Sequence, residues 1–254
     1  MFKLEGRVAL VTGSGQGIGM ATAMTLAGQG ADLAIVDVDA ARAEAAAARV
    51  RSHGRRVLAI PADVTDEGQV GRIFERCIDE LGRLDILVNN VGGSGGSATP
   101  LESTSLEVWD RVLTFNVRSA FLCTRAAIPL LKRQGGRVVL LSSMAGTSRT
   151  LIGGVAYATA KAALLGFTRQ LAQELGTAGI TVNAVAPGII QSDRIERAFA
   201  AHPTASFKQA LTQIPLGRPG RVEDLAAAIT YLCSDEASYV TGVTLEVNGG
   251  IHFL

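Results

Sequence analysis

Short β-branched runs alternate with helical stretches along almost the whole chain, and this alternation constrains the fold more than any other feature. The runs are nearly continuously apolar, as expected for strands buried on both faces of a parallel sheet. The pattern predicts an α/β fold with a doubly wound, seven-stranded parallel sheet of the Rossmann type and helices on both faces. The expected strands are 8–12, 33–37, 57–62, 86–89, 137–142, 181–186 and 244–247, and the expected helices are 18–29, 40–52, 67–81, 106–133, 157–176 and 222–234.

We predict a single domain over residues 1–254, because no linker or change of composition divides the chain. Two stretches leave the alternation. Residues 92–100 are a Gly- and Ser-rich loop, and residues 189–214 are an insertion with helical pieces, broken by Pro203. Irregular segments beyond the carboxyl ends of parallel strands are where ligands bind. The insertion is therefore expected to form a substrate loop or lid.

Composition argues against several classes of partner. The net charge of +1 is spread over interspersed acids and bases, which gives no footprint for nucleic acid or an anionic membrane. The three cysteines and three histidines are scattered, so we expect no disulfide framework and no metal site. No apolar run approaches the ~18 residues of a membrane span. Because the first strand begins near the N-terminus, no signal peptide is expected, and a cytoplasmic location is predicted.

A glycine-rich turn follows the first strand and opens the first helix, over residues 12–19. The glycines do not match G-x-G-x-x-G strictly. They follow G-x-x-x-G-x-G, with an additional Gly15. Glycines allow a sharp turn, a close approach to a pyrophosphate and tight packing of helix on strand. The alternative is a glycine-rich turn without a ligand. We expect the nucleotide contacts to come from Gly13, Gln16, Gly17, Ile18 and Gly19.

Asp37 ends the second predicted strand. A carboxylate at this place accepts both ribose hydroxyls of adenosine and repels a 2′-phosphate. Recognition of NADP usually needs a nearby basic residue, and neither Ser14 nor Val38 is basic. The sequence therefore favours NAD(H) over NADP. A cap of the following helix is the alternative role for Asp37, although Asp39 suits that role better.

Polar residues also follow the third and fourth strands, at the same edge of the sheet as the glycine turn. Asp63, followed by Val64, is placed to bond the adenine amino group. The stretch from Asn90 to Gly92 would let the backbone pass close to the ribose. Each is also consistent with an ordinary polar strand exit.

Tyr157 and Lys161 lie four residues apart in a predicted helix, and therefore on one face, one turn apart. An ammonium held beside a phenol favours the phenolate, which is what a tyrosine needs in order to exchange a proton near neutral pH. The spacing alone also fits an exposed tyrosine and a solvated lysine on an ordinary helix.

Taken together, these motifs resemble those of the short-chain dehydrogenase/reductase family in its one-domain form, and the resemblance covers the whole chain. Departures are small: Val91 stands where Ala is usual, Ser192 where Thr is common, and Asn248 where Asp is frequent. The residues that carry the resemblance are 12–19, Asp63, 89–92, Asn116, Ser143, Tyr157, Lys161, Asn183, Pro187-Gly188, 240–242 and 247–250.

The resemblance assigns roles to individual residues. Ser143, rather than Ser142, would hold the substrate oxygen, Tyr157 would exchange the proton, and Lys161 would also bond the nicotinamide ribose. Asn116 would belong to a relay that joins Lys161 to solvent, with a satisfied buried amide as the alternative. The segment that would pack on the nicotinamide and meet its carboxamide contains Pro187, Gly188, Ile190 and Ser192.

The implied activity is metal-free hydride transfer between NAD(H) and a secondary alcohol or ketone. A 3-oxoacyl thioester reductase of the same family is an alternative, although such reductases usually take NADPH, against which Asp37 argues. A catalytically silent NAD-binding regulator would not need Ser143, Tyr157 and Lys161, and a methyltransferase would have no use for the last two. The resemblance also implies a homotetramer assembled through the helices at 106–133 and 157–176 and the last strand.

Overall fold

The computed structural model describes residues 1–96, 99–150, 153–191 and 210–253. It contains one seven-stranded sheet in the order β3-β2-β1-β4-β5-β6-β7, and every pair of neighbours is parallel. This confirms the doubly wound α/β fold. The strands are β1 (Val8–Thr12), β2 (Asp32–Asp37), β3 (Val57–Pro61), β4 (Ile86–Asn89), β5 (Gly136–Leu141), β6 (Ile180–Pro187) and β7 (Thr244–Val247).

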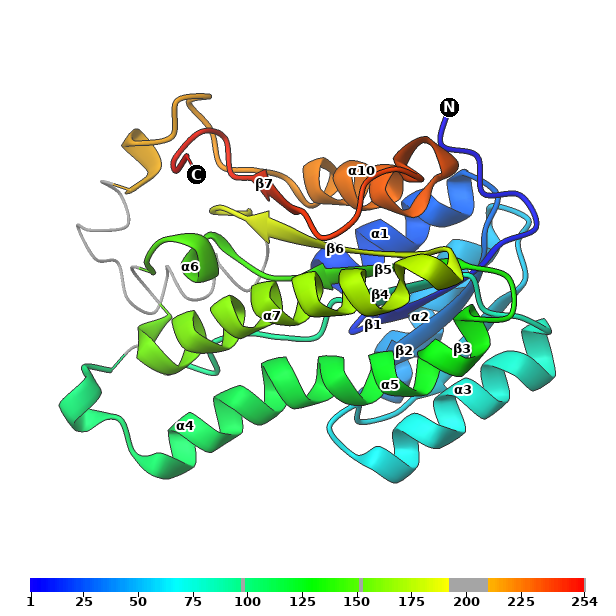
Figure 1. Ribbon diagram of the computed structural model, residues 1–254, viewed down its shortest axis with the longest axis horizontal. Coiled ribbons are helices and arrows are strands. Elements are labelled where there is room, and N and C mark those ends of the chain that lie inside the picture. Colours follow the sequence, from blue (N-terminus) through cyan, green and yellow to red (C-terminus); the bar gives the residue numbers. More distant parts are fainter. Residues whose placement is uncertain (97–98, 151–152, 192–209, 254) are drawn as a thin grey trace.

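Helices cover both faces of the sheet (Figure 1). One face packs against α3 (Glu67–Leu81), α5 (Ser119–Leu131) and α7 (Gly154–Leu175). The other packs against α1 (Gly17–Gly28), α2 (Ala40–Arg51) and α10 (Val222–Cys233). The remaining described helical segments are α4 (Leu106–Leu113), α6 (Met144–Thr147) and the short turns Leu101–Ser103, Thr114–Arg118, Gly176–Ala178 and Asp235–Ala237.

The period of two along β1 explains the two layers of core. Val8 and Leu10 join the cluster under α3, α5 and α7, whereas Ala9 and Val11 join the cluster under α1, α2 and α10. All four side chains are at most 1% exposed. A strand buried on both faces has no polar side, and this accounts for the continuous apolar runs in the sequence.

Local signals set several helix ends. Asp39 and Asp66 are N-caps, and their carboxylates accept the backbone N–H of Arg42 and Gln69 respectively. Gly82 ends α3 in the left-handed conformation, with φ of +86°. Each side-chain cap of this kind stabilises a helix by about 1 kcal/mol.

Two predictions of secondary structure were wrong. The long helix expected at 106–133 is interrupted by a π-helical turn at Thr114–Arg118, which contains the buried Asn116. The Asn116 Nδ2 donates to the Val112 carbonyl oxygen at 2.8 Å and to the Gly93 carbonyl oxygen at 2.9 Å, so a contact outside the helix fixes the wider turn. The helix expected from residue 157 begins earlier, at Gly154.

The insertion expected at 189–214 lies largely outside the described residues, since 192–209 are not described. Its described parts include Ile190, which forms a bridge with Gly220, and residues 210–212, which are helical. No helix in the described part of the chain is both long enough and apolar enough to cross a bilayer.

The cysteines are buried and free, as the scattered positions suggest. Burial raises the pKa of the Cys77, Cys123 and Cys233 thiols to about 12, and the nearby Asp85 adds to the effect at Cys77. The thiolate is the reactive form, so burial keeps these thiols largely unreactive at pH 8.

We therefore expect the folded protein to resist a chromogenic disulfide reagent at pH 8, and all three thiols to react within minutes in denaturant. Absorbance of the released thiolate measures both reactions. Rapid labelling of one thiol in the folded protein, with its circular dichroism unchanged, would contradict this burial.

Candidate active site at the carboxyl edge of the sheet

The predicted site residues gather at the carboxyl ends of the strands. The order β3-β2-β1-β4-β5-β6-β7 reverses direction between β1 and β4, which makes their carboxyl ends the switch point of the sheet. Open α/β sheets bind their ligands at this point. The glycine turn follows β1, Asp37 ends β2, and Asn90 to Gly92 follow β4.

The start of α1 has the features of an anion site. Gln16 occupies the N-cap position without making a side-chain cap, and the first turn contains no acidic residue. Gly17 has φ of +57°, and a Cβ built on it would meet no atom within 4 Å. The first amides of a helix lack internal partners and attract negative charge. The turn therefore fits the pyrophosphate of a dinucleotide.

Gly19 lies where helix and turn are closest. A Cβ on Gly19 would stand 2.3 Å from the Gly13 carbonyl oxygen and 2.6 Å from the Asn90 Nδ2. Asn90 itself donates from Nδ2 to the carbonyl oxygens of Thr12 and Gly13, at 2.9 and 3.0 Å. Its side chain thus holds the glycine turn in place through these two hydrogen bonds. The sequence predicted only a contact of this segment with the ribose.

The additional Gly15 is explained by Asp37. The Gly15 N–H donates to the Asp37 Oδ2 at 3.0 Å, and a Cβ on Gly15 would lie 2.6 Å from the same oxygen. The Asp39 N–H donates to the other oxygen, Oδ1, at 3.0 Å. Asp37 is only 7% exposed, so these two backbone donors hold a largely buried carboxylate beside the glycine turn.

The structure also corrects the search for basic residues near Asp37. Arg42 lies there, with its Nη2 3.5 Å from the Asp37 Oδ1. Sequence reasoning considered only the immediate neighbours Ser14 and Val38. The signal that would have found Arg42 is the Asp39 cap, which puts Arg42 in the first turn of α2 and next to the end of β2.

Asp63, which follows β3, already makes hydrogen bonds within its own turn. The Asp63 Oδ1 accepts the backbone N–H and the hydroxyl of Thr65, both at 2.8 Å. Val64 is buried. The predicted contact of Asp63 with adenine would have to be made in addition to this local turn.

Tyr157 and Lys161 lie on the same side of α7, as predicted from their spacing. Lys161 is 3% exposed, and its Nζ donates to the Leu141 carbonyl oxygen at 2.7 Å. The same Nζ lies 5.7 Å from the centroid of the Tyr157 ring. The structure therefore contains a buried ammonium beside a tyrosine at the end of β5, in place of a solvated lysine on the surface.

Gly92 and Asn116 complete this corner. A Cβ on Gly92 would lie 2.7 Å from the Lys161 Nζ and 2.6 Å from the Asn116 Oδ1. The Asn116 Oδ1 accepts the Gly93 N–H at 2.9 Å. The π-helical turn and the segment after β4 are thereby joined next to the ammonium.

The two serines after β5 have different contacts. The Ser142 hydroxyl is buried and donates to the Lys161 carbonyl oxygen at 2.8 Å, which ties α7 to the strand. Ser143 is the N-cap of α6, and its Oγ accepts the Ala145 N–H at 3.1 Å. An oxygen that accepts this bond still has its own hydrogen to donate. The structural role of Ser142 was missed by sequence reasoning.

The segment after β6 turns sharply against the C-terminal region. The Gly188 N–H donates to the Val247 carbonyl oxygen at 3.1 Å, and a Cβ on Gly188 would lie 2.8 Å from the Asn248 Cα. Pro187 ends β6, and Ile190 is buried. Ser192, predicted to meet the carboxamide, lies outside the described residues.

Comparison with known proteins identifies the family. Residues 13–252 match the family model described as enoyl-(acyl carrier protein) reductase. The 3-oxoacyl-[acyl-carrier-protein] reductase of Escherichia coli K12 is 38% identical over 252 residues, which cover 98% of this chain and 99% of the relative. The chain belongs to the short-chain dehydrogenase/reductase family.

Solved structures of the family agree with this assignment. NAD⁺-bound xylitol dehydrogenase superposes with a TM-score of 0.93 at 32% identity, covering 98% of this chain and 100% of the other. A 7α-hydroxysteroid dehydrogenase in complex with NADH and 7-oxo glycochenodeoxycholic acid gives a TM-score of 0.91 at 33% identity, over 98% and 95% of the two chains. As a member of this family, the protein is an oxidoreductase with a nicotinamide cofactor. Across the described ranges, no three His, Cys, Asp or Glu side chains are grouped to hold a metal ion.

For a short-chain dehydrogenase/reductase, the contact at Gly19 gives a direct test of the nucleotide turn. We expect Gly19→Ala to lower the melting temperature, because overpacking costs about 1–3 kcal/mol, and to weaken NAD binding at least tenfold. Calorimetry measures both effects. Gly71→Ala is the control, because a Cβ at that helical glycine meets no atom within 4 Å. Unchanged NAD affinity in Gly19→Ala would argue against nucleotide binding at this turn.

Proposed function

We propose that this protein is an NAD(H)-linked oxidoreductase that interconverts a ketone and a secondary alcohol, with 3-oxoacyl thioesters as the first substrate class to test. The observation that carries the proposal is the buried Lys161 Nζ, 5.7 Å from the Tyr157 ring at the carboxyl edge of the sheet. The substrate class rests on the curated relatives, whose names describe reduction of a 3-oxoacyl group at 37–38% identity.

Each proposed catalytic group has a defined task. The Tyr157 Oη gives a proton to the substrate oxygen during reduction and takes it back during oxidation. The Lys161 ammonium favours the phenolate form of Tyr157 through its positive charge. The Ser143 Oγ donates its hydrogen to the substrate oxygen while it accepts from Ala145. The nicotinamide, when bound, supplies or accepts the hydride.

Asn116 is proposed to link the ammonium to solvent. Its side chain is held by Gly93 and Val112 and sits against the same Gly92 position as the Lys161 Nζ. A fixed amide beside the ammonium keeps the backbone of the π-helical turn and of the loop after β4 in place. In the proposed relay, backbone groups of this region and water would pass a proton between solvent and Lys161.

The proposed dinucleotide site runs from β3 across to β6. The pyrophosphate would be held by Gly13, Gln16, Gly17, Ile18 and Gly19. The adenosine half would be surrounded by Asp37, Asp63, Val64, Asn90 and Gly92. The nicotinamide half would be surrounded by Tyr157, Lys161, Pro187, Gly188, Ile190 and Ser192. Asp37 favours NAD(H), because a buried carboxylate repels a 2′-phosphate.

A second candidate is an NAD-linked dehydrogenase that works mainly toward the ketone. The carboxylate of Asp37 favours this candidate over an NADPH-dependent reductase. The names of the two solved relatives describe NAD⁺ or NADH bound to dehydrogenases of a polyol and a hydroxysteroid. A silent NAD-binding regulator explains the site less well, because it has no need for a buried lysine beside a tyrosine.

The three buried thiols fit a reducing compartment, so the cytoplasm remains the proposed location.

The decisive experiment follows nicotinamide absorbance with a panel of 3-oxoacyl thioesters, simple ketones, polyols and hydroxysteroids. We expect turnover with at least one member, and we expect Tyr157→Phe to lower it by about 10²–10⁴-fold, the usual range for loss of a general acid or base. NAD binding, measured by calorimetry, should change little because only one hydroxyl is removed.

Tyr239→Phe is the matched control, because Tyr239 is fully exposed. It should keep wild-type turnover. If Tyr157→Phe retains most of its activity with the best substrate, Tyr157 is not the proton donor.

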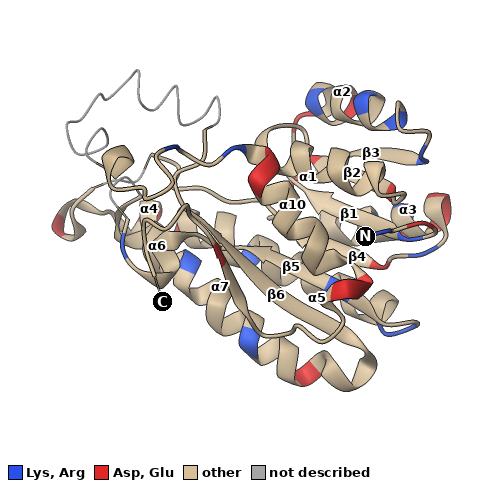
Figure 2. Ribbon diagram, turned by 90° about the horizontal axis from the view of Figure 1, so that it is seen from above, with Lys and Arg blue, Asp and Glu red and all other residues tan. Residues whose placement is uncertain are grey.

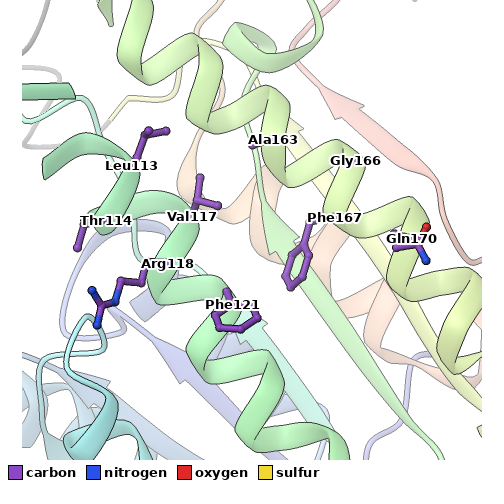
Figure 3. A pocket seen from close by; sticks show the side chains of 9 residues that line it. All are labelled: Leu113, Thr114, Val117, Arg118, Phe121, Ala163, Gly166, Phe167 and Gln170. Carbon is purple, nitrogen blue, oxygen red and sulfur yellow. The ribbon is translucent and has the colours of Figure 1, made fainter. Parts of the chain in front are cut away.

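We also propose that the chain associates with itself, as a homotetramer, through its two helical regions, residues 106–133 and α7, and through the last strand, β7. A shallow groove of about 640 Å³ lies between residues 113–121 and α7 (Figure 3). It contains mainly apolar side chains and neither Tyr157 nor Lys161. The described lining residues are Leu113, Thr114, Val117, Arg118, Phe121, Ala163, Gly166, Phe167 and Gln170. A second copy that presents the same two helices would cover the exposed Phe121 by two-fold symmetry.

Gly166→Arg tests this association, because a Cβ at Gly166 meets no atom within 4 Å of its own chain and the arginine would project into the groove. Light scattering should show an oligomer for the wild type and a smaller species, down to the 26.4 kDa monomer, for the variant. Gly71→Arg, at a similarly open helical glycine outside the groove, should leave the mass unchanged. An unaltered mass in Gly166→Arg would place the interface elsewhere.

A further inference from the structure

Arg42 brings a guanidinium to the carboxylate that is proposed to select the coenzyme. Its Nη2 lies 3.5 Å from the Asp37 Oδ1, and its Nε lies 3.3 Å from the Asp39 Oδ2. The Arg42 side chain is 41% exposed, whereas the Asp37 side chain is 8% exposed. Arg42 therefore stands between a buried carboxylate and solvent, at the adenosine end of the proposed site.

The backbone fixes where this arginine begins. The Arg42 N–H donates to the Asp39 carboxylate at 3.0 Å, in the first turn of α2. The Arg42 Cβ is close enough to the glycine turn that a Cβ on Gly15 would come within 2.9 Å of it. The base of the Arg42 side chain thus lies against the glycine turn. Arginine suits phosphate recognition because its planar group donates in pairs.

Asp37 keeps its position without Arg42, whereas Arg42 is held mainly by its ion pairs. Asp37 accepts the N–H groups of Gly15 and Asp39, so its position does not require Arg42. The Arg42 Nε is buried and forms an ion pair with the Asp39 Oδ2 at 3.3 Å, but it makes no hydrogen bond of good geometry to any described residue. Arg42 is held at this place by charge, opposite two carboxylates, with a hydrogen-bonding group left over.

We propose that Arg42 is a second determinant of coenzyme choice: a latent ligand for a 2′-phosphate, which Asp37 holds in check. This rests on the proposed nicotinamide site. With Asp37 present, two carboxylates face one guanidinium, the local charge is negative, and a 2′-phosphate is repelled. Without the Asp37 carboxylate, the guanidinium can turn to a phosphate beside the ribose and use its unfilled donor. The preference for NAD then depends on both residues. Asp37 repels the 2′-phosphate, and it also pairs with the Arg42 guanidinium that would otherwise bind this phosphate.

The test measures binding to the protein without substrate, by calorimetry with 5′-AMP and with adenosine 2′,5′-bisphosphate. These two ligands differ only in the 2′-phosphate. Asp37→Ser, Arg42→Ala and the double variant form a cycle with the wild type. We expect the wild type to prefer 5′-AMP. Asp37→Ser should gain at least tenfold in affinity for the bisphosphate, and the double variant should lose most of that gain while it keeps its affinity for 5′-AMP.

Arg49→Ala in the Asp37→Ser background is the matched control. Arg49 is exposed and carries the same charge on the same helix, seven residues and therefore about 10 Å further along its axis. Figure 2 shows the basic residues of α2 in blue. It should leave the gain intact. An equal loss in the Arg49 and Arg42 variants would assign the effect to the general positive charge of α2 and overturn the proposal.

Two further outcomes also overturn it, and they differ in what else they affect. If Asp37→Ser binds 5′-AMP but gains nothing for the bisphosphate, or if the gain persists in the double variant, Arg42 has no such role and the proposed function stands. If the wild type binds neither nucleotide, the proposed function fails together with this inference.

Discussion

The tie between β1 and β4 is the interaction on which the rest of the site depends. The Thr12 hydroxyl accepts the N–H groups of Asn90 and Val91, at 3.0 and 3.2 Å, and Asn90 returns two bonds to Thr12 and Gly13. These bonds join the end of β1 to the segment after β4 at the switch point of the sheet. The glycine turn lies on one side of the tie and Gly92 on the other, so a single cluster of hydrogen bonds positions both halves of the proposed cofactor site.

A buried lysine needs this support. Desolvation of an ammonium is costly unless polar partners surround it. The Lys161 Nζ donates to the Leu141 carbonyl, while the Lys161 carbonyl accepts from Ser142. These two bonds run in opposite directions between the end of β5 and α7. They hold the helix in register with the strand, and Tyr157 lies one helical turn away from Lys161 on α7. The charge proposed to assist Tyr157 and the bond that fixes α7 thus come from the same residue.

Most of the fold follows from local patterns. Apolar runs gave the strands because each strand is buried on both faces, and the capping residues Asp39 and Asp66 set helix starts through contacts within four residues. The π-helical turn at Thr114–Arg118 did not follow, because its cause is a bond from Asn116 to Gly93, 23 residues away. Arg42 was missed for a different reason. Only Ser14 and Val38 were considered as possible basic neighbours of Asp37, although the Asp39 cap places Arg42 in the first turn of the helix that directly follows β2.

The proposed site has a reacting end and an end that selects the coenzyme, and the two are separate. The names of the relatives are therefore a better guide to the reaction than to the coenzyme. The groups proposed for the reaction, Tyr157 and Lys161, come from α7, beside β5 and β6. The groups proposed for coenzyme choice, Asp37 and Arg42, come from β2 and α2, beyond β1. The tie at β1 and β4 lies between them, and no described contact joins the two sets directly. The chemistry at one end can therefore be retained while charges at the other end change. A relative that reduces a 3-oxoacyl group is thus a guide to the reacting end, whereas the coenzyme must be inferred from the charges that this chain itself places beside the ribose.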